Sequence, residues 1–156
     1  MINILFVCMG NICRSPSGEA VMNKLVKRAG LQEEIQCDSA GTIAYHEGEQ
    51  ADARMKHHAL KRGYRLTSVA RKFREEDFTN FDYIIAMDND NYNDLLKFDR
   101  EGKYQNKIFK MTDFAQEGKY SEVPDPYYGG SEGFENVLDI LGDSCNGLLE
   151  FIKKKI

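Results

Sequence analysis

The stretch that decides the fold is residues 2–26, INILFVCMGNICRSPSGEAVMNKLV. Residues 2–7 form a short, mostly apolar run, which is typical of a central parallel strand buried on both faces. A segment containing Gly10 follows, and Ser15–Pro16 then predicts a helix with serine as its N-cap and proline at its first helical position. The apolar periodicity of this helix ends at Gly30. The stretch therefore predicts a buried strand that runs through a tight loop directly into a helix.

The remainder of the chain alternates short apolar strands with amphipathic helices. Further strands are predicted at 35–41, 83–87 and 107–111, and further helices at 51–62, around Tyr92, Leu95 and Leu96, and at 134–152. This alternation predicts an α/β fold: a small doubly wound domain with a four-stranded parallel sheet, helices on both faces and flavodoxin-like topology. No linker or repeat interrupts the pattern, so we expect a single domain over residues 1–156. Residues 115–133 are rich in Gly, Pro, Asp and Tyr, and we expect a long functional loop there.

The composition excludes several classes of protein. Of the 156 residues, 42% are hydrophobic and 29% are charged, which indicates a globular domain and not a disordered or fibrous chain. The formal charge of −4 argues against a protein that coats nucleic acid. No apolar run approaches the ~18–20 residues needed to span a membrane, and the N-terminus lacks the basic region of a signal peptide. We therefore expect a cytoplasmic protein with free thiols and with no nucleic-acid or membrane partner.

The loop between the first strand and the first helix, residues 8–15 (the first loop), has the features of an anion-binding site. Consecutive backbone N–H groups in such a loop can surround one anion, and the helix dipole adds positive charge. Gly10 permits the positive φ of a tight turn, and Asn11 tolerates a left-handed conformation. Arg14 supplies a planar cation that matches two phosphate oxygens. The first loop therefore predicts a phosphate cradle.

Cys8 stands at the base of this cradle, where the hydrogen-bond donors of the loop converge. Their field favours the thiolate, and the hydroxyl of Ser15 could hold the sulfur in that form. A thiolate in this place is a nucleophile aimed at a bound phosphate. The other interpretation is that Cys8 is a small core residue at the end of a strand. A cysteine and an arginine six residues apart are weak evidence alone, but the strand, glycine and helix start around them favour the nucleophile.

A thiolate that attacks a phosphate ester displaces an oxygen, and that oxygen needs a proton donor. Asp125, in the run VPDPYYGG of residues 123–130, is predicted to be this donor. Prolines on both sides restrict the backbone and fix the direction of the carboxyl group. A neighbouring thiolate favours the protonated form of the acid. Tyr127 and Tyr128 could form walls for an aromatic substrate. A surface turn is the alternative, because Asp-Pro and Gly-Gly are turn signals.

From residue 3 to the C-terminal helix, the chain resembles the low-molecular-weight protein tyrosine phosphatases. The resemblance is carried by VCMGNICRSP (7–16), DSAGT (38–42), FDYI (81–84), MD (87–88) and DPYYG (125–129). It implies hydrolysis of protein phosphotyrosine monoesters through a phosphocysteine intermediate, without a cofactor. Cys8 would be the nucleophile, and Arg14 would bind the phosphate and the transition state. Asp125 would act first as general acid and then as general base.

The resemblance also implies the partners and the residues around the substrate. Tyrosine-phosphorylated proteins would be the substrates, and inorganic phosphate or another oxyanion would inhibit by occupying the first loop. Asn11, Ser15 and Ser39 would brace that loop. Glu19 matches an acidic position of the family, but Ser68 stands where many relatives have its histidine partner. The expected substrate-binding residues are Met9, Gly10, Asn11, Ile12, Cys13, Ser15, Tyr45, Tyr127 and Tyr128, with Tyr45 as an aromatic wall where some relatives have tryptophan.

Three other functions use related residues. Arsenate reduction on the same fold needs two further cysteines near the third strand, and no cysteine lies between Cys37 and Cys145, so that relay is excluded. A phosphoarginine phosphatase would have a small polar residue in place of Ile12, whose apolar side chain fits a flat aromatic ring better. A non-catalytic phosphate-binding module is the third alternative, and the presence of both Cys8 and Asp125 argues against it.

Cys13 has two interpretations that the sequence leaves open. It lies five residues from Cys8 on a loop that curls back on itself, so the two sulfurs could form a disulfide. Cys13 would then be a redox partner that traps oxidised Cys8 before irreversible oxidation. Alternatively, Cys13 packs under the loop and has no redox role.

Other polar residues are expected to have no role in a site. No cysteine or histidine spacing predicts a metal site. His46, His57 and His58 are expected at the solvated surface. The acidic runs 75–77 and 88–90 are expected to begin helices on a solvated face.

Overall fold

The computed structural model of the protein describes residues 1–127 and 130–156. Its centre is a four-stranded sheet in which each strand runs parallel to its neighbours, in the order β2-β1-β3-β4. The strands are β1 (Ile2–Cys8), β2 (Ile35–Gly41), β3 (Tyr83–Ala86) and β4 (Ile108–Lys110). The predicted α/β fold is confirmed, and this strand order is the flavodoxin-like one.

β1 lies inside the sheet because its residues are apolar on both faces. Val7 pairs with Ala40 of β2 on one side and with Ala86 of β3 on the other. The side chains of β1 alternate between two core clusters: Ile4, Phe6 and Cys8 belong to the larger cluster, and Leu5 and Val7 to the smaller one. The chain that leaves β1 therefore emerges where the strand order changes direction, the usual place for a ligand in an open α/β sheet.

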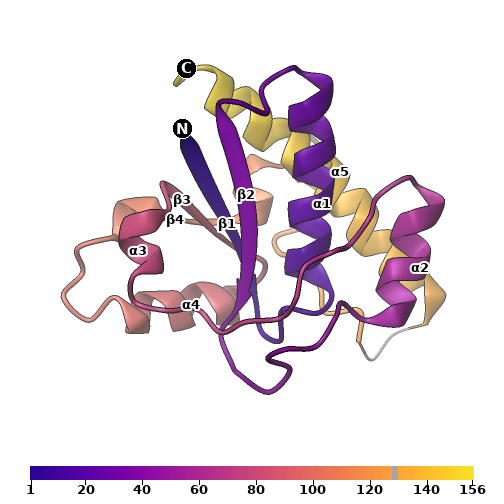
Figure 1. Ribbon diagram of the computed structural model, residues 1–156, viewed down its shortest axis with the longest axis horizontal. Coiled ribbons are helices and arrows are strands. Elements are labelled where there is room, and N and C mark those ends of the chain that lie inside the picture. The colour runs from indigo at the N-terminus through magenta and orange to yellow at the C-terminus, as the bar shows by residue number, and fades with distance from the viewer. Residues whose placement is uncertain (128–129) are drawn as a thin grey trace.

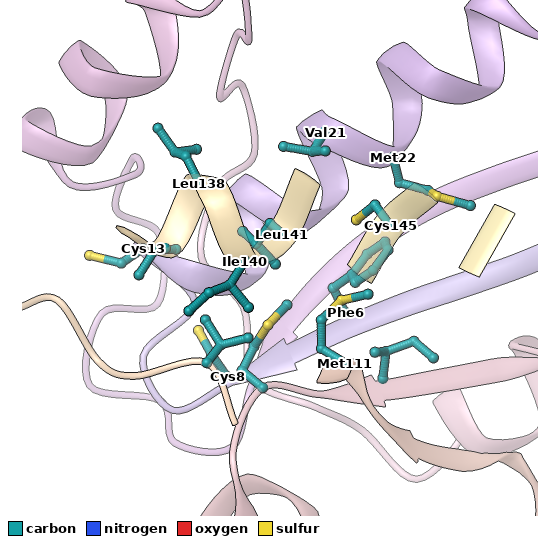
Figure 2. Packing of buried hydrophobic residues seen from close by; sticks show 14 of the residues in the cluster. Phe6, Cys8, Cys13, Val21, Met22, Met111, Leu138, Ile140, Leu141 and Cys145 are labelled. Carbon is teal, nitrogen blue, oxygen red and sulfur yellow. The ribbon is translucent and has the colours of Figure 1, made fainter. Parts of the chain in front are cut away.

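Two helices cover the face of the larger cluster. They are α1 (Arg14–Arg28) and α5 (Ser131–Lys153), which pack against each other. Figure 2 shows the side chains that fill the space between them and β1, including Val21 of α1, Cys145 of α5 and Phe6 of β1. Cys8 and Cys13 belong to the same cluster, so the first loop is continuous with the core.

The opposite face is covered by α4 (Asn89–Phe98) and by the short α3 (Asp77–Asn80). Phe78 of α3 and Leu95 of α4 join Leu5 and Val7 of the sheet in the smaller cluster. The helix α2 (Ala53–Lys61) lies outside the sheet and packs on α5. Figure 1 shows α3 and α4 on one side of β1 and β2, and α1, α5 and α2 on the other.

The two chain termini and the first loop lie at opposite ends of the molecule (Figure 1). Two 3-10 helices flank β4, η1 (Gln105–Lys107) and η2 (Met111–Phe114). Between η2 and α5 the described residues form no helix or strand, as predicted for a long loop. Within the described part of the chain, no helix combines the length and apolar character needed to cross a membrane.

The periodicity of the sequence located the four strands and the four longest helices but not the short elements. The two 3-10 helices were not predicted, because a single turn has too few residues to produce a periodic pattern. The helix start expected at the acidic run 75–77 is present as the short α3, which begins at Asp77. The predicted N-cap of α1 was wrong as well. The helix begins at Arg14 with Cys13 as N-cap, and no side chain caps it.

Candidate active site

The first loop joins β1 to α1 at the carboxyl end of the sheet. The residue of this loop in the left-handed conformation is Asn11, with φ of 59°. Gly10 does not have a positive φ, so the conformational role expected for this glycine was wrong. Gly10 has a different reason to be small. A Cβ at this position would lie 2.9 Å from a ring carbon of His46, so a larger residue would displace that ring.

Cys8 is the last residue of β1 and is only 3% exposed. Its Sγ accepts a hydrogen bond from the backbone N of Asn11 at 3.3 Å and lies 3.0 Å from Oγ of Ser15. The same hydroxyl oxygen accepts from Nδ2 of Asn11 at 2.8 Å, and its proton has two acceptors within reach, the sulfur and the backbone O of Ala40 at 3.4 Å. Ser15 therefore faces Cys8 instead of capping α1. The sulfur thus has one backbone N–H donor and one hydroxyl within hydrogen-bond distance.

Asn11 connects the first loop to a distant part of the chain. Its Oδ1 accepts a hydrogen bond from the backbone N of Arg71 at 3.0 Å. Ion pairs with Asp77 at 2.9 Å and with Asp38 at 3.2 Å hold the guanidinium of Arg71 in turn. Asp77 is 4% exposed, so the prediction of a solvated face for the run 75–77 was wrong at this residue. The ion pair with Arg71 is what stabilises the buried carboxylate.

Arg14 is buried beneath the cavity and is held by two partners. Its NH1 donates to Oδ2 of Asp88 at 2.6 Å and to the backbone O of Val123 at 3.0 Å. Burial disfavours the charged form, but the negative charges of Cys8 and Asp88 outweigh it and raise the pKa of Arg14 above its ordinary value. Asp88 was expected on a solvated face, and this prediction was wrong. Its position directly beyond β3, at the end of the sheet where Cys8 lies, was the signal that could have identified it.

Asp125 lies on the other long loop and faces the same cation. Its Oδ2 is 3.8 Å from NH2 of Arg14, and its Oδ1 accepts a hydrogen bond from the backbone N of Tyr127 at 2.9 Å. The side chain is 34% exposed, so water reaches the carboxyl group. Cys8, Arg14 and Asp125, which come from two motifs far apart in the sequence, line one cavity.

This cavity has a volume of about 290 Å³ and opens above the first loop. Met9, Gly10, Ile12 and Cys13 of the loop line it, together with Tyr127. A second group follows β2: Ile43, Tyr45 and His46. Ile43 and His46 were missed because residues 42–50 have the composition of an ordinary polar loop. Asn11 and Ser15 lie behind the cavity and contact Cys8, so they support the site and do not line it.

The expected aromatic walls differ in how firmly they are held. Tyr45 is 82% exposed and contacts the ring of His46 edge-on, with centroids 4.8 Å apart. Tyr127 is 41% exposed, and the guanidinium of Arg54 lies 5.3 Å from its ring centroid. Ile12 is nearly buried and forms an apolar part of the lining. Tyr128, the other expected wall, lies outside the described residues.

Ser39 is buried next to the loop, but its hydroxyl donates to Oε1 of Glu19 at 2.7 Å. Among the hydrogen bonds of the described residues, none joins the Ser39 side chain to the first loop itself. Burial raises the pKa of Glu19 to about 7, and the hydrogen bond from Ser39 offsets only part of this shift. Within the described residues, the hydrogen-bond partner of the Glu19 carboxyl group is therefore Ser39 on β2.

Cys13 is 4% exposed and lines the cavity beside Cys8. Both are free thiols. Burial, reinforced by the negative charges of Asp52 and Cys8, raises the pKa of the Cys13 thiol, so this residue stays protonated. Cys13 packs in the core and also faces the cavity, and its redox role stays a prediction.

His58 was expected at the surface, and this was wrong. Its Nδ1 is hydrogen-bonded to Oε2 of Glu135, and its ring stacks on Phe134 with centroids 5.3 Å apart. Glu135 also accepts from Arg62 at 2.7 Å, so α2 is fastened to the beginning of α5. No three or more His, Cys, Asp or Glu side chains of the described residues form a group that could hold a metal ion.

Comparison with known proteins indicates one family. The family model described as low molecular weight phosphotyrosine protein phosphatase matches residues 3–156. The low molecular weight phosphotyrosine protein phosphatase of Schizosaccharomyces pombe is 41% identical over 152 residues, which are 97% of each chain. A crystal structure of a protein tyrosine phosphatase from Entamoeba histolytica with Hepes in the active site has a TM-score of 0.97, 53% identity and 99% coverage of both chains. A structure of a drosophila arginine phosphatase has a TM-score of 0.90 and 31% identity, covering 96% of this chain and 97% of that one.

Proposed function

The chain belongs to the low molecular weight phosphotyrosine protein phosphatase family and is an enzyme of that kind, and we propose that it acts through a phosphocysteine on Cys8 with Asp125 as general acid and base. The observation that carries this proposal is the placement of both residues on one cavity, with Arg14 beneath it. A thiolate with converging donors, a buried cation and a carboxyl group are the parts that phosphoryl transfer to sulfur needs.

In the first step, the backbone N–H groups of the first loop and the guanidinium of Arg14 bind the phosphate oxygens. Cys8 Sγ attacks phosphorus, and the S–P bond forms as the bond between phosphorus and the phenolic oxygen breaks. Asp125 gives its proton to that oxygen, so the alcohol leaves neutral. Because Asp88 already orients Arg14 at 2.6 Å, the cation needs little rearrangement as charge builds on the oxygens.

In the second step, a water molecule attacks the phosphorus of the phosphocysteine. Asp125, now a carboxylate, takes a proton from that water. The S–P bond breaks, inorganic phosphate leaves, and the Cys8 thiolate regains its hydrogen bonds with Asn11 and Ser15. The exposure of Asp125 supports this step, since water must reach the carboxylate while the sulfur is occupied.

The substrate class is assigned to phosphotyrosine because of what lines the cavity. Ile12 and Tyr127 present apolar and aromatic surface above the phosphate position, which suits a flat ring. A phosphoserine side chain is shorter, so it would leave these walls without contact and its phosphorus short of Cys8. Phosphoarginine is the second candidate, since a drosophila arginine phosphatase has the same fold, but the apolar Ile12 offers no partner to a guanidinium.

The mechanism is tested with two substrates that differ in their leaving group. Asp125→Ala should slow hydrolysis of phenyl phosphate by about 10²–10⁴-fold and that of p-nitrophenyl phosphate much less, because nitrophenolate leaves without full protonation. Cys8→Ser should have no turnover. Equal losses for both substrates would exclude the general-acid role, and turnover by Cys8→Ser would exclude the phosphocysteine.

The substrate class is tested with matched peptides that differ only in the phosphorylated residue. Reach and aromatic contact together should favour phosphotyrosine over phosphoserine by about 100-fold in kcat/KM. Comparable values for the two peptides, or faster hydrolysis of phosphoarginine, would contradict the assignment.

A further inference from the structure

The loop that carries Asp125 is attached to the rest of the protein on both sides of that residue. On the N-terminal side, the backbone N of Val123 donates to the backbone O of Met87 at 2.8 Å, and the backbone O of Val123 accepts from Arg14 at 3.0 Å. On the C-terminal side, the backbone O of Tyr127 accepts a hydrogen bond from Arg54 of α2. The backbone N of Tyr127 donates to Oδ1 of Asp125 at 2.9 Å. The place of Tyr127 therefore affects the direction of the carboxyl group.

Arg54, on the first turn of α2, contacts the C-terminal side of this loop in three ways. Its NH2 donates to the backbone O of Tyr127 at 3.3 Å. Its guanidinium carbon lies 5.3 Å from the ring centroid of Tyr127 and 5.0 Å from that of Phe134 at the beginning of α5. One planar cation thus touches the backbone and ring of the loop residue and the helix that follows.

Arg54 is itself connected to the first loop through Asp52. Asp52 caps α2 by accepting from the backbone N of Arg54 at 2.9 Å and of Met55 at 3.2 Å. Its other carboxylate oxygen accepts from NH2 of Arg54 at 3.3 Å. The backbone N of Asp52 donates to the backbone O of Ile12 in the first loop at 2.8 Å. A continuous set of contacts therefore runs from the loop of the nucleophile to the loop of the acid.

We propose that Arg54 is a positioning residue, which sets the place of Asp125 relative to Cys8 by holding Tyr127 against the start of α2. The proposal rests on the general-acid role of Asp125 stated above. Arg54 is not among the described residues that line the cavity, so it acts through Asp125 and not on the phosphate. Lysine would replace it only in part, since an ammonium group keeps the charge but lacks the planar group that meets Asp52, Tyr127 and Phe134 together.

The first experiment measures the dependence on the leaving group. Arg54→Gln should lower kcat for phenyl phosphate by about tenfold or more and kcat for p-nitrophenyl phosphate by much less. A displaced Asp125 slows only the reaction whose leaving group must be protonated. Inhibition by inorganic phosphate should be unchanged. Arg54→Lys should lie between the wild type and Arg54→Gln.

Arg62→Gln is the matched control, since Arg62 is an arginine at the other end of α2 that binds Glu135 and Asp139 of α5. It should change the melting temperature but not the dependence on the leaving group. If Arg54→Gln and Arg62→Gln affect the two substrates in the same way, Arg54 has only a structural role and the proposal is wrong.

A double-mutant cycle separates this proposal from the mechanism on which it rests. In an Asp125→Asn background, Arg54→Gln should cause no further loss of kcat for phenyl phosphate, because the residue through which it acts is gone. A further loss as large as in the wild type would show that Arg54 acts independently of Asp125. If Asp125→Asn alone lowers kcat for both substrates by the same factor, the general-acid mechanism is excluded, and this proposal is excluded with it. If Asp125→Asn is selective but Arg54→Gln is not, only the positioning role is excluded.

Discussion

Asp88 and Arg14 form an ion pair at 2.6 Å across a separation of 74 residues, and the arginine side chain is only 3% exposed. Asp88 also caps α4, since its Oδ1 accepts a hydrogen bond from the backbone N of Asn91 at 2.7 Å. The pair fixes the guanidinium of Arg14 beneath the cavity, and Asp88 balances its charge while no phosphate is bound there. We therefore expect the stability of the protein to depend on whether an anion occupies the cavity.

Asp88→Asn removes the charge but keeps an oxygen that can cap α4. We expect it to lower the free energy of unfolding by about 3 kcal/mol, because buried Arg14 loses its nearest carboxylate and keeps only the more distant one of Asp125 and the backbone O of Val123. Inorganic phosphate should raise the melting temperature of this variant more than that of the wild type, since the bound anion replaces the missing charge. Thermal melting with and without phosphate measures both effects. An equal shift in the two proteins would contradict this prediction.

Glu19→Gln should change the pH dependence of stability. The folded pKa of about 7 lies above the ordinary value of 4.5, so the folded protein holds this proton more tightly than the unfolded chain does. The contribution of Glu19 to stability is present in full below the ordinary pKa and is lost as the pH rises through the folded pKa. The variant, which is always neutral, should match the wild type at about pH 4 and exceed it by about 1–3 kcal/mol at about pH 8. Denaturant titrations at the two pH values test this, with the exposed Glu33→Gln as the control that should show no such difference.

Cys13→Ala should make oxidation of the enzyme irreversible. Because burial raises the pKa of the Cys13 thiol, Cys8 is expected to be the first to react with peroxide, and Cys13 is placed on the same cavity to capture the sulfenic acid. The wild type should recover its activity with a thiol reductant, and mass spectrometry should find the Cys8–Cys13 disulfide. Cys37→Ala, at a half-buried cysteine outside the cavity, should recover like the wild type. Recovery of Cys13→Ala to the same extent would assign this residue to packing alone.

Tyr127→Ala should raise KM for a phosphotyrosine peptide more than Tyr45→Ala does. Tyr127 is held by Arg54, whereas Tyr45 is 82% exposed and must lose its freedom of rotation to contact a substrate. Loss of one fixed aromatic contact corresponds to about 0.5–1.5 kcal/mol, or roughly two- to twelvefold in KM. Inhibition by inorganic phosphate should stay unchanged in both variants. A larger effect of Tyr45→Ala would indicate that its ring closes over the substrate.

The strands, the main helices and the two loops of the candidate site could be predicted because each depends on residues that are close in the sequence. The apolar run of β1 and the glycine, arginine and serine that follow it are local patterns, and so are the prolines around Asp125. The partners of these residues are not local. Nothing in the run 75–77 distinguishes Asp77 from a solvated acid, and Asp88 is marked only by its position after β3. Only the fold brings the two carboxylates to Arg71 and Arg14.

The same reasoning explains the errors at single residues. Ser15 has the sequence context of a helix cap, but the sulfur of Cys8 competes for its hydroxyl. His58 has the context of a surface residue, but Glu135 and Phe134 of α5 cover it. The contact between Arg54 and Tyr127 could not be predicted from the sequence. One arginine in a polar helix is common, and only the fold brings the loop after residue 115 to it.

The supports of the first loop come from far along the chain. Its contacts with Arg71, Asp88 and Val123 span 60, 74 and 109 residues, respectively. On the ribosome, Cys8 is therefore made long before the segments that complete its surroundings. In a short nascent chain, it lacks the contacts that these later segments provide to the first loop. Because the proposed reaction also needs Asp125, we expect no reactivity toward phosphate esters until synthesis has passed that residue and the chain has closed around Arg14. We therefore expect activity to appear only late in synthesis, after the partners of Arg14 have been made.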